Sequence, residues 1–175
     1  LADIKQQIDQ RDDLPHHLGY FMEGPFTQPH PDMAMGDAKA PVLTPDMYEA
    51  AIEASKGVVN RWMAAPELEG GMEFGRALRA AGITGCMGHS NATVADVEEA
   101  MMNGYSCVVH LYSVMSTVTR DNGFRRGGLV EAGLLFDDLD VEIICDGCHL
   151  PPELIKLAIK CKGYDKLMLV SDCGP

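Results

Sequence analysis

Residues 83–110 read ITGCMGHSNATVADVEEAMMNGYSCVVH, and this stretch indicates the fold class. The short apolar run at 83–87 predicts a buried strand, and the periodic segment at 94–102 predicts a helix. A second apolar run at 105–109 predicts the next strand. A strand, a helix and a second strand in this order are typical of the βαβ unit, in which the two strands run parallel.

The same alternation continues on both sides of this stretch. Further strands are expected at residues 17–22, 58–63, 141–145 and 167–170, and further helices at 47–55, 72–81, 128–135 and 151–161. The strands are short and apolar along their length, as in a parallel sheet that is covered on both faces. Units of this kind form either an open doubly wound sheet or a closed β/α barrel. No glycine-rich phosphate-binding fingerprint follows the first strand, which weakens the dinucleotide-binding version of the open sheet.

Polar residues recur just after the predicted strands, and they favour the barrel. Five of them lie within a few residues of a strand end: Glu23, His89, His110, His149 and Asp172. In a β/α barrel, the carboxyl ends of all strands meet at the face that carries the chemistry. We therefore predict an α/β fold, a partial (β/α)8 TIM-type barrel with about six βα units in one domain over residues 1–175. A complete barrel has eight strands, so about two are expected to be missing.

The residues at the strand ends suit a divalent metal ion. Two imidazoles and one carboxylate can hold such an ion and leave a position open for water. A metal ion lowers the pKa of its water toward ~7, and a further carboxylate such as Asp172 can accept the proton. Taken singly, each residue has a plainer interpretation, because a histidine after a strand is usually a hydrogen-bonded loop residue and an aspartate often caps a helix. Their shared position at strand ends favours the metal site.

Charge and hydropathy exclude several classes of partner. The chain carries a net charge of −12 and has no basic stripe that could neutralise the phosphates of a nucleic acid. No apolar run approaches the roughly 18 residues that a membrane span requires. An anionic substrate would need local positive charge, and the cluster Arg120, Arg125 and Arg126 offers it.

The six cysteines are interpreted as reduced thiols of a cytosolic protein. Four of them lie in or just after apolar strands, where cysteine acts as a small hydrophobic residue. Cys145 and Cys148 form a C-x-x-C pair, but no second pair completes a zinc site. The chain begins at Leu1 rather than at a methionine and stops just after an apolar run, so we expect both ends to be cut from a longer protein.

Five segments of the chain carry a family resemblance. They are Met22-Glu23-Gly24-Pro25-Phe26, Gly88-His89-Ser90-Asn91-Ala92-Thr93, His110-Leu111-Tyr112-Ser113-Val114-Met115, Asp146-Gly147-Cys148-His149 and Val170-Ser171-Asp172. In order and spacing they resemble L-E-G-P-F, G-H-S-N-A-T, H-L-Y-N-A-M, D-G-x-H and V-T-D of the N-acetylglucosamine-6-phosphate deacetylases, in the amidohydrolase superfamily. The resemblance covers nearly the whole chain. It implies a cytoplasmic enzyme of amino-sugar catabolism that hydrolyses N-acetylglucosamine 6-phosphate to glucosamine 6-phosphate and acetate.

The resemblance also implies residue roles. Glu23, His89 and His110 look like the ligands of one catalytic metal ion, zinc by preference and otherwise iron or cobalt. Asp172 looks like the general base, which later protonates the departing amine. The implied substrate contacts are Ser113 and Val114 at the sugar phosphate, Asp146 and His149 in a substrate loop, and Arg125 at the phosphate, where Arg120 or Arg126 could replace it. The family also implies a homodimer, and a β-sandwich formed by termini that this chain lacks.

The chain departs from the family pattern at three places. Ser113 stands where the family usually has asparagine, and Met22 where it often has histidine. The family's G-A-H segment has its nearest match in Gly36-Asp37-Ala38, which lacks the histidine. Two alternatives therefore stay open: a related amidohydrolase acting on another amide or cyclic amide, or a non-catalytic barrel that binds metal or phosphosugar. Retention of the four residues that would bind metal and move protons favours the enzyme.

Overall fold

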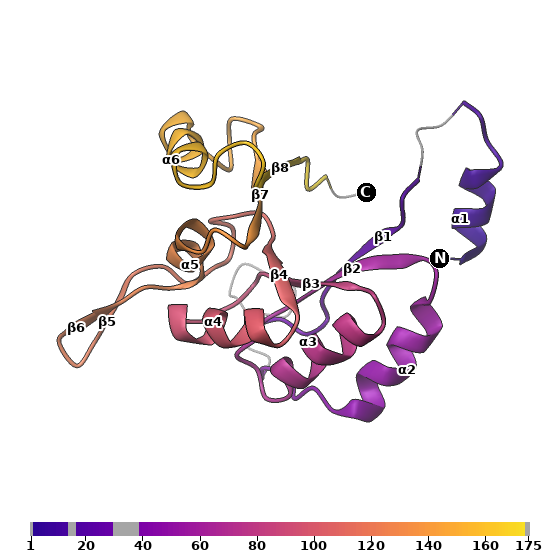
Figure 1. The fold of residues 1–175 in the computed structure, drawn as a ribbon, viewed down its shortest axis with the longest axis horizontal. Helices are drawn as coiled ribbons and strands as arrows, with labels where there is room; N and C mark the ends of the chain where they lie inside the picture. Colours follow the sequence, from indigo (N-terminus) through magenta and orange to yellow (C-terminus); the bar gives the residue numbers. More distant parts are fainter. Residues whose placement is uncertain (1, 14–16, 30–38, 174–175) are drawn as a thin grey trace.

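Six parallel strands form one curved sheet in the computed structural model, which describes residues 2–13, 17–29 and 39–173 (Figure 1). The strands are β1 (Tyr20–Glu23), β2 (Val59–Ala64), β3 (Thr84–Met87), β4 (Tyr105–Val108), β7 (Asp140–Ile144) and β8 (Leu167–Val170), and they lie side by side in this order. A doubly wound sheet has a point where the strand order reverses, whereas here every strand pairs with the next strand of the sheet along the chain. The prediction of a partial (β/α)8 barrel is confirmed.

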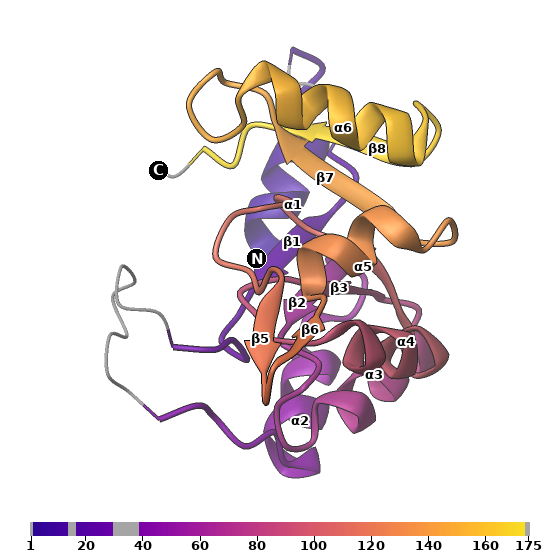
Figure 2. The same ribbon diagram turned by 90° about the vertical axis from the view of Figure 1, so that its left-hand side faces the viewer.

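Five helices connect the strands and cover the convex side of the sheet (Figure 1). They are α2 (Pro45–Ser55), α3 (Gly71–Ala80), α4 (Val94–Met102), α5 (Leu129–Leu135) and α6 (Pro152–Lys162). Figure 2 shows α6 and β8 at one end of the array and α2 at the other. Helix α4 begins with a capping box in which Thr93 and Asp96 each bind the backbone N–H of the other, which fixes where the loop after β3 ends.

Apolar side chains fill the space between the sheet and the helices, and a smaller apolar cluster lies on the other side of the sheet. Between sheet and helices, the fully buried ring of Phe74 contacts the rings of Phe26, Tyr48 and Trp62 at centroid distances of 5.0, 5.4 and 5.6 Å. A second cluster, Met63, Cys86, Cys107 and Val109, belongs to alternate positions of the strands. Because side chains alternate across a strand, these residues line the concave side of the sheet.

The observed helices and strands differ from the predicted ones at three places. Strand β1 begins at Tyr20 rather than at residue 17, because its pairing with the next strand begins where the Tyr20 N–H donates to Val58 O. Helix α1 (Ala2–Asp9), for which no prediction was made, precedes it. Residues 113–126, where no strand was expected, contain a hairpin of β5 (Thr119–Asp121) and β6 (Phe124–Arg126).

The cysteines also depart in part from expectation. All six are free, yet only Cys86 and Cys107 are buried. Cys145 and Cys173, expected to pack as small hydrophobic residues, are exposed, because they lie just past the ends of β7 and β8 where no helix covers the chain. None of the helices in the described part of the chain is long and apolar enough to cross a membrane.

Candidate metal centre

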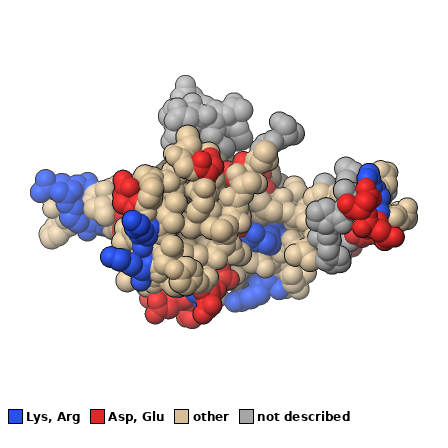
Figure 3. All heavy atoms as spheres, turned by 90° about the horizontal axis from the view of Figure 1, so that it is seen from above, with Lys and Arg blue, Asp and Glu red and all other residues tan. Residues whose placement is uncertain are grey.

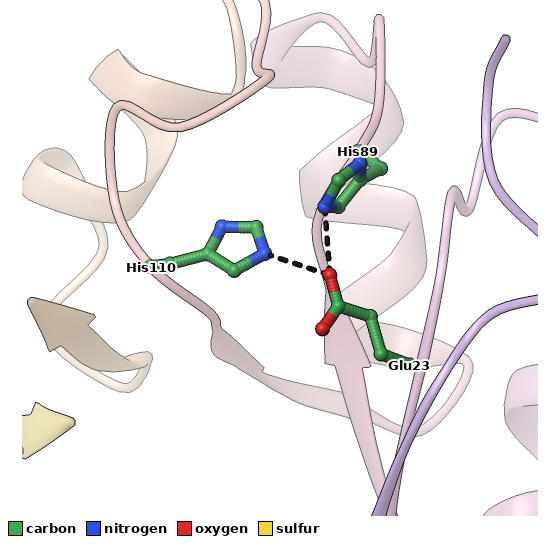
Figure 4. A group of neighbouring side chains, drawn as sticks. All are labelled: Glu23, His89 and His110. Atoms are coloured by element: carbon green, nitrogen blue, oxygen red, sulfur yellow. Dashed lines mark ion pairs between the residues drawn. The ribbon is translucent and has the colours of Figure 1, made fainter. Parts of the chain in front are cut away.

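Glu23, His89 and His110 meet at the carboxyl end of the sheet (Figure 4). Glu23 is the last residue of β1, and the histidines follow β3 and β4. Glu23 Oε1 lies 2.8 Å from His89 Nε2 and 3.5 Å from His110 Nε2. One ligand atom from each residue lies within 4.8 Å of the others, and no other group of three such residues in the described part of the chain comes as close. Parallel pairing thus gathers side chains that are far apart in the sequence.

The chemistry of these three residues fits a divalent metal ion. Two imidazole nitrogens and a carboxylate oxygen are the donors that zinc and its first-row neighbours take from proteins. His110 is only 2 % exposed, and neither of its ring nitrogens has a hydrogen-bond partner. At 3.5 Å its approach to Glu23 is an electrostatic contact rather than a hydrogen bond. Since an unsatisfied buried polar group costs about 1–3 kcal/mol, this ring is arranged for a partner that lies between it and the carboxylate.

The charged and ionisable neighbours of Glu23 and His110 shift the pKa values of both residues. His110 and then His89 hold the pKa of the Glu23 carboxyl far below its usual value, so this side chain is ionised at neutral pH. Burial by itself lowers the pKa of His110, but the negative charges of Glu23 and Asp172 outweigh it and raise that pKa above its ordinary value. The carboxylates therefore make the space between the rings favourable for positive charge.

Strained backbone is concentrated around the cluster. His89, His110 and Asp172 have φ angles of 45°, 32° and 48°, and the nearby Tyr112 and Val114 have 80° and 51°. Non-glycine residues in this left-handed region cost about 1–3 kcal/mol each and persist only where the surroundings hold them. Such residues cluster at functional sites, so the strain supports the assignment of this end of the sheet as the site.

Asp172 faces the same cavity as Glu23. The cavity has a volume of about 510 Å³ and lies on the concave side of the sheet, where Arg61 and Glu142 also line it. Arg61 and the buried Glu142 form an ion pair across this face. Asp172 is close enough to His110 for its charge to act on that ring. Its role as general base stays a prediction, but its position allows it.

Ser113 and Val114 border the site on another side. The Ser113 N–H donates to His110 O at 2.9 Å, so Ser113 braces the strained histidine. Val114 lines a small pocket of about 100 Å³ together with Gln28, His89 and Asn91. The expected contact of these two residues with a sugar phosphate stays a prediction. The segment Gly36-Asp37-Ala38, compared above with the family's G-A-H, lies outside the described residues.

Asp146 and His149 are hydrogen-bonded to each other in the loop after β7. Asp146 Oδ1 accepts from the backbone N–H groups of Cys148 and His149 at 2.8 and 2.9 Å, and its Oδ2 lies 2.7 Å from His149 Nδ1. A carboxylate can only accept, so Nδ1 of the neutral ring carries the hydrogen and Nε2 is left for a ligand. Both side chains are about half exposed, in keeping with a role in substrate contact.

The loop predicts a specific pH dependence. The two backbone N–H groups and the His149 ring lower the pKa of Asp146 from 3.8 to about 2. Because the folded-state pKa is depressed, the stabilisation that Asp146 provides is complete above its unfolded pKa and is lost as the pH falls through the folded value. We expect the difference in unfolding free energy between the wild type and Asp146→Asn to be constant above about pH 5 and to shrink between about pH 4 and 2. Urea unfolding over this range measures it, with Asp165→Asn as a surface control, and a difference that stays constant down to the lowest pH would contradict the prediction.

Arg125 lies on β6, in a hairpin that projects from the body of the molecule, away from the strands that carry the cluster (Figure 1). Figure 3 shows Lys and Arg gathered at that end of the molecule. In the hairpin, Arg126 pairs with Asp121 at 2.9 Å, and Arg120 Nε donates to Gly123 O at 3.4 Å. The structure therefore does not bring Arg125 to Glu23 and the histidines, and its phosphate contact stays a prediction.

One residue beside the site, Glu67, was not predicted from the sequence. Glu67 follows β2, and its carboxylate accepts hydrogen bonds from Gln28, Ser90 and Asn91. A signal was present, because Glu67 is a further carboxylate just after a strand, as Glu23 is at the end of one. Its partners lie 23 to 39 residues away in the chain, and sequence reasoning had no means to identify them.

Comparison with known proteins shows similarity over most of the chain, although no protein-family model matches it. The chain is 31 % identical to an N-acetylglucosamine-6-phosphate deacetylase of Bacillus subtilis (strain 168) over 155 residues, which cover 89 % of the chain and 38 % of that relative. Over 97 residues, 55 % of the chain and 24 % of the relative, it is 37 % identical to an N-acetylgalactosamine-6-phosphate deacetylase of Shewanella sp. (strain ANA-3). The crystal structure of N-acetylglucosamine-6-phosphate deacetylase from Pasteurella multocida superposes with a TM-score of 0.81 at 26 % identity, covering 98 % of the chain and 43 % of that protein. The chain thus spans about two fifths of the length of the deacetylases that match most of it.

Proposed function

We propose, from the premise that this chain belongs to the N-acetylglucosamine-6-phosphate deacetylase family, that it forms the metal-binding part of such an enzyme. The reaction is hydrolysis of N-acetylglucosamine 6-phosphate, in which water adds across the amide C–N bond to give acetate and glucosamine 6-phosphate. The observation that carries the proposal is the meeting of Glu23, His89 and His110 at the carboxyl end of the sheet. This end is the catalytic face of β/α barrels.

Zinc is the proposed metal, with iron or cobalt as alternatives that suit the same donors. Glu23 Oε1, His89 Nε2 and His110 Nε2 would hold it, since these are the atoms that face one another. When bound, the ion would polarise the amide carbonyl and lower the pKa of the attacking water.

Asp172 is proposed to move the proton. The proposal is supported by the cavity that Asp172 lines together with Glu23. As general base it takes a proton from the water, and as general acid it delivers that proton to the amine nitrogen when the C–N bond breaks.

The substrate contacts are proposed to come from two loops beside the cluster and from the projecting hairpin that carries Arg125. His149, held by Asp146 through Nδ1, presents Nε2 to a hydroxyl or carbonyl oxygen of the sugar. Ser113 and Val114 are proposed to contact the sugar phosphate through their backbone. Arg125 is proposed to bind the phosphate, because its planar fork matches two phosphate oxygens.

The remaining architecture is proposed on the family's pattern. The chain would be a partial barrel domain that lacks the first barrel strands and the β-sandwich formed by the termini. The complete protein would be a cytoplasmic homodimer. Its phosphosugar substrate would reach the open concave side of the sheet.

The 4-epimer is a second candidate substrate, because the chain is also similar to an N-acetylgalactosamine-6-phosphate deacetylase. The two substrates differ only in the orientation of one hydroxyl group. Both are therefore assayed.

Acetate release from purified protein tests the proposed function. We expect zinc-loaded protein to release acetate from N-acetylglucosamine 6-phosphate, to lose this activity after treatment with a chelator, and to regain it when Zn²⁺ is added. N-acetylgalactosamine 6-phosphate, unphosphorylated N-acetylglucosamine, dihydroorotate and an isoaspartyl dipeptide serve as competing substrates. Hydrolysis of either of the last two would identify a different amidohydrolase. Stoichiometric zinc without turnover of any of them would identify a binding protein.

A further inference from the structure

The carboxylate of Glu67 connects three loops at the carboxyl end of the sheet. Oε1 accepts from Gln28 Nε2 at 2.9 Å and from Asn91 N at 2.6 Å, and Oε2 accepts from Ser90 Oγ at 2.7 Å. Gln28 lies in the loop after β1, Glu67 in the loop after β2, and Ser90 and Asn91 in the loop after β3. Hydrogen bonds to an ionised acceptor are roughly twice as strong as neutral ones, so this connection is firm.

Ser90 extends the connection to the loop that carries His110. Its Oγ accepts from the Ala92 N–H at 3.0 Å while donating to Glu67. Its backbone oxygen accepts from the Ser116 N–H at 2.9 Å, and Ser116 Oγ donates to Ala92 O at 2.6 Å. The loops after β3 and β4 are therefore held together around the residue that Glu67 binds.

His89 lies at the centre of these contacts. Its backbone oxygen accepts from the Gln28 N–H at 2.9 Å, and it directly precedes Ser90 and Asn91. Its φ of 45° is a conformation that histidine adopts only when the neighbouring chain is held in place. Gln28, Ser90 and Asn91 hold it, and all three bind the same carboxylate.

We propose that Glu67 is a positioning residue for the metal centre, which sets the direction of His89 Nε2 toward Glu23 and His110 by holding the loops on both sides of His89. The inference rests on the proposed function, because it concerns the metal that this function requires. Glu67 is not itself proposed as a ligand, since both of its oxygens are engaged by protein donors. A purely structural role would lower thermal stability alone, whereas a positioning role also changes metal affinity and geometry.

The test compares Glu67→Ala and Glu67→Gln with the control Glu69→Gln, an exposed glutamate two residues further along the same loop. Zn²⁺ affinity is measured by competition with a chromophoric chelator, ligand geometry by the absorption spectrum of Co²⁺-substituted protein, and folding by circular dichroism. We expect Glu67→Ala to lower Zn²⁺ affinity about tenfold. Removing a residue that orients a metal ligand usually costs about 10- to 100-fold, and this value is at the lower end of that range. Glu67→Gln should have a smaller effect, because its amide oxygen still accepts hydrogen bonds from the loops. Some effect should remain, because its NH2 group then faces other donors. Glu69→Gln should bind Zn²⁺ as the wild type does.

The outcomes separate this inference from the function on which it rests. Unchanged Zn²⁺ affinity and an unchanged Co²⁺ spectrum in both Glu67 variants would overturn the positioning role, even if their melting temperatures fall and the wild type deacetylates. If the wild type binds Zn²⁺ but releases no acetate, the proposed function fails and the Zn²⁺ titrations still decide the role of Glu67. A wild type that binds no Zn²⁺ overturns both. Should Glu67→Ala not fold, Glu67→Gln carries the test, because it keeps the volume of the side chain.

Discussion

Asp172→Asn is expected to lower kcat for deacetylation of N-acetylglucosamine 6-phosphate by about 10²–10⁴-fold, the usual contribution of a positioned general base. Asparagine keeps the shape of the side chain but cannot accept a proton from water near neutral pH. Asp172 lines the cavity beside Glu23 without belonging to the group of three close ligand atoms. Asp172→Asn should therefore still bind zinc, with a much smaller loss of affinity than Glu23→Gln shows.

The measurement is acetate release at saturating substrate, together with elemental analysis of bound zinc. Asp165→Asn is the matched control, because it makes the same chemical change at an exposed residue before β8. Loss of turnover together with loss of zinc would show that Asp172 acts as a ligand or structural residue. An unchanged kcat would place the general base elsewhere.

Glu23→Gln is expected to weaken zinc binding by more than about 100-fold and to abolish turnover. This loss exceeds the roughly 10- to 100-fold cost of removing a residue that only orients a metal ligand. Glu23 is the only carboxylate in the group of three close ligand atoms, and both histidine Nε2 atoms face its Oε1. A neutral amide oxygen is a weaker ligand and removes the negative charge that raises the pKa of His110. The site then lacks the carboxylate charge that lies nearest to both histidine rings and favours a cation.

Competition titration with Zn²⁺ measures this loss, and thermal unfolding gives an independent readout. Zinc at 100 times the wild-type Kd should stabilise the wild type by about 2.7 kcal/mol and should stabilise Glu23→Gln by less than about 0.4 kcal/mol at the same concentration. Glu98→Gln, an exposed change on α4, serves as the control. If Glu23→Gln retained wild-type affinity, the cluster would not be the metal site.

Much of the fold could be predicted from the chain alone. The apolar runs and helix periods gave all six strands of the main sheet, and α4 was predicted at its observed bounds, 94–102. The hairpin was missed because strands β5 and β6 have three residues each and are largely polar, too short for a period of two to appear. Its one signal was the pair Asn122-Gly123, whose φ angles of 47° and 88° suit a two-residue hairpin turn.

The candidate site was predicted only in part. Strand ends located Glu23, His89 and His110 because parallel strands bring their carboxyl ends to one edge. The family resemblance implied Arg125 for the substrate phosphate, but the residue lies on a projecting hairpin, and no pattern in the sequence indicates in which direction a hairpin points.

The sequence by itself determined the order of strands and helices, and hence which residues stand at the carboxyl edge. This information is local, because apolar periodicity and capping residues act within a few positions of the chain. Only the tertiary structure decided that two imidazoles and a carboxylate come within 4.8 Å of one another, and that Glu67 holds the loops beside His89. The physical reason is that these contacts depend on how the sheet curves and on backbone angles such as the φ of 45° at His89. Packing across residues far apart in the chain, rather than local propensity, imposes such angles.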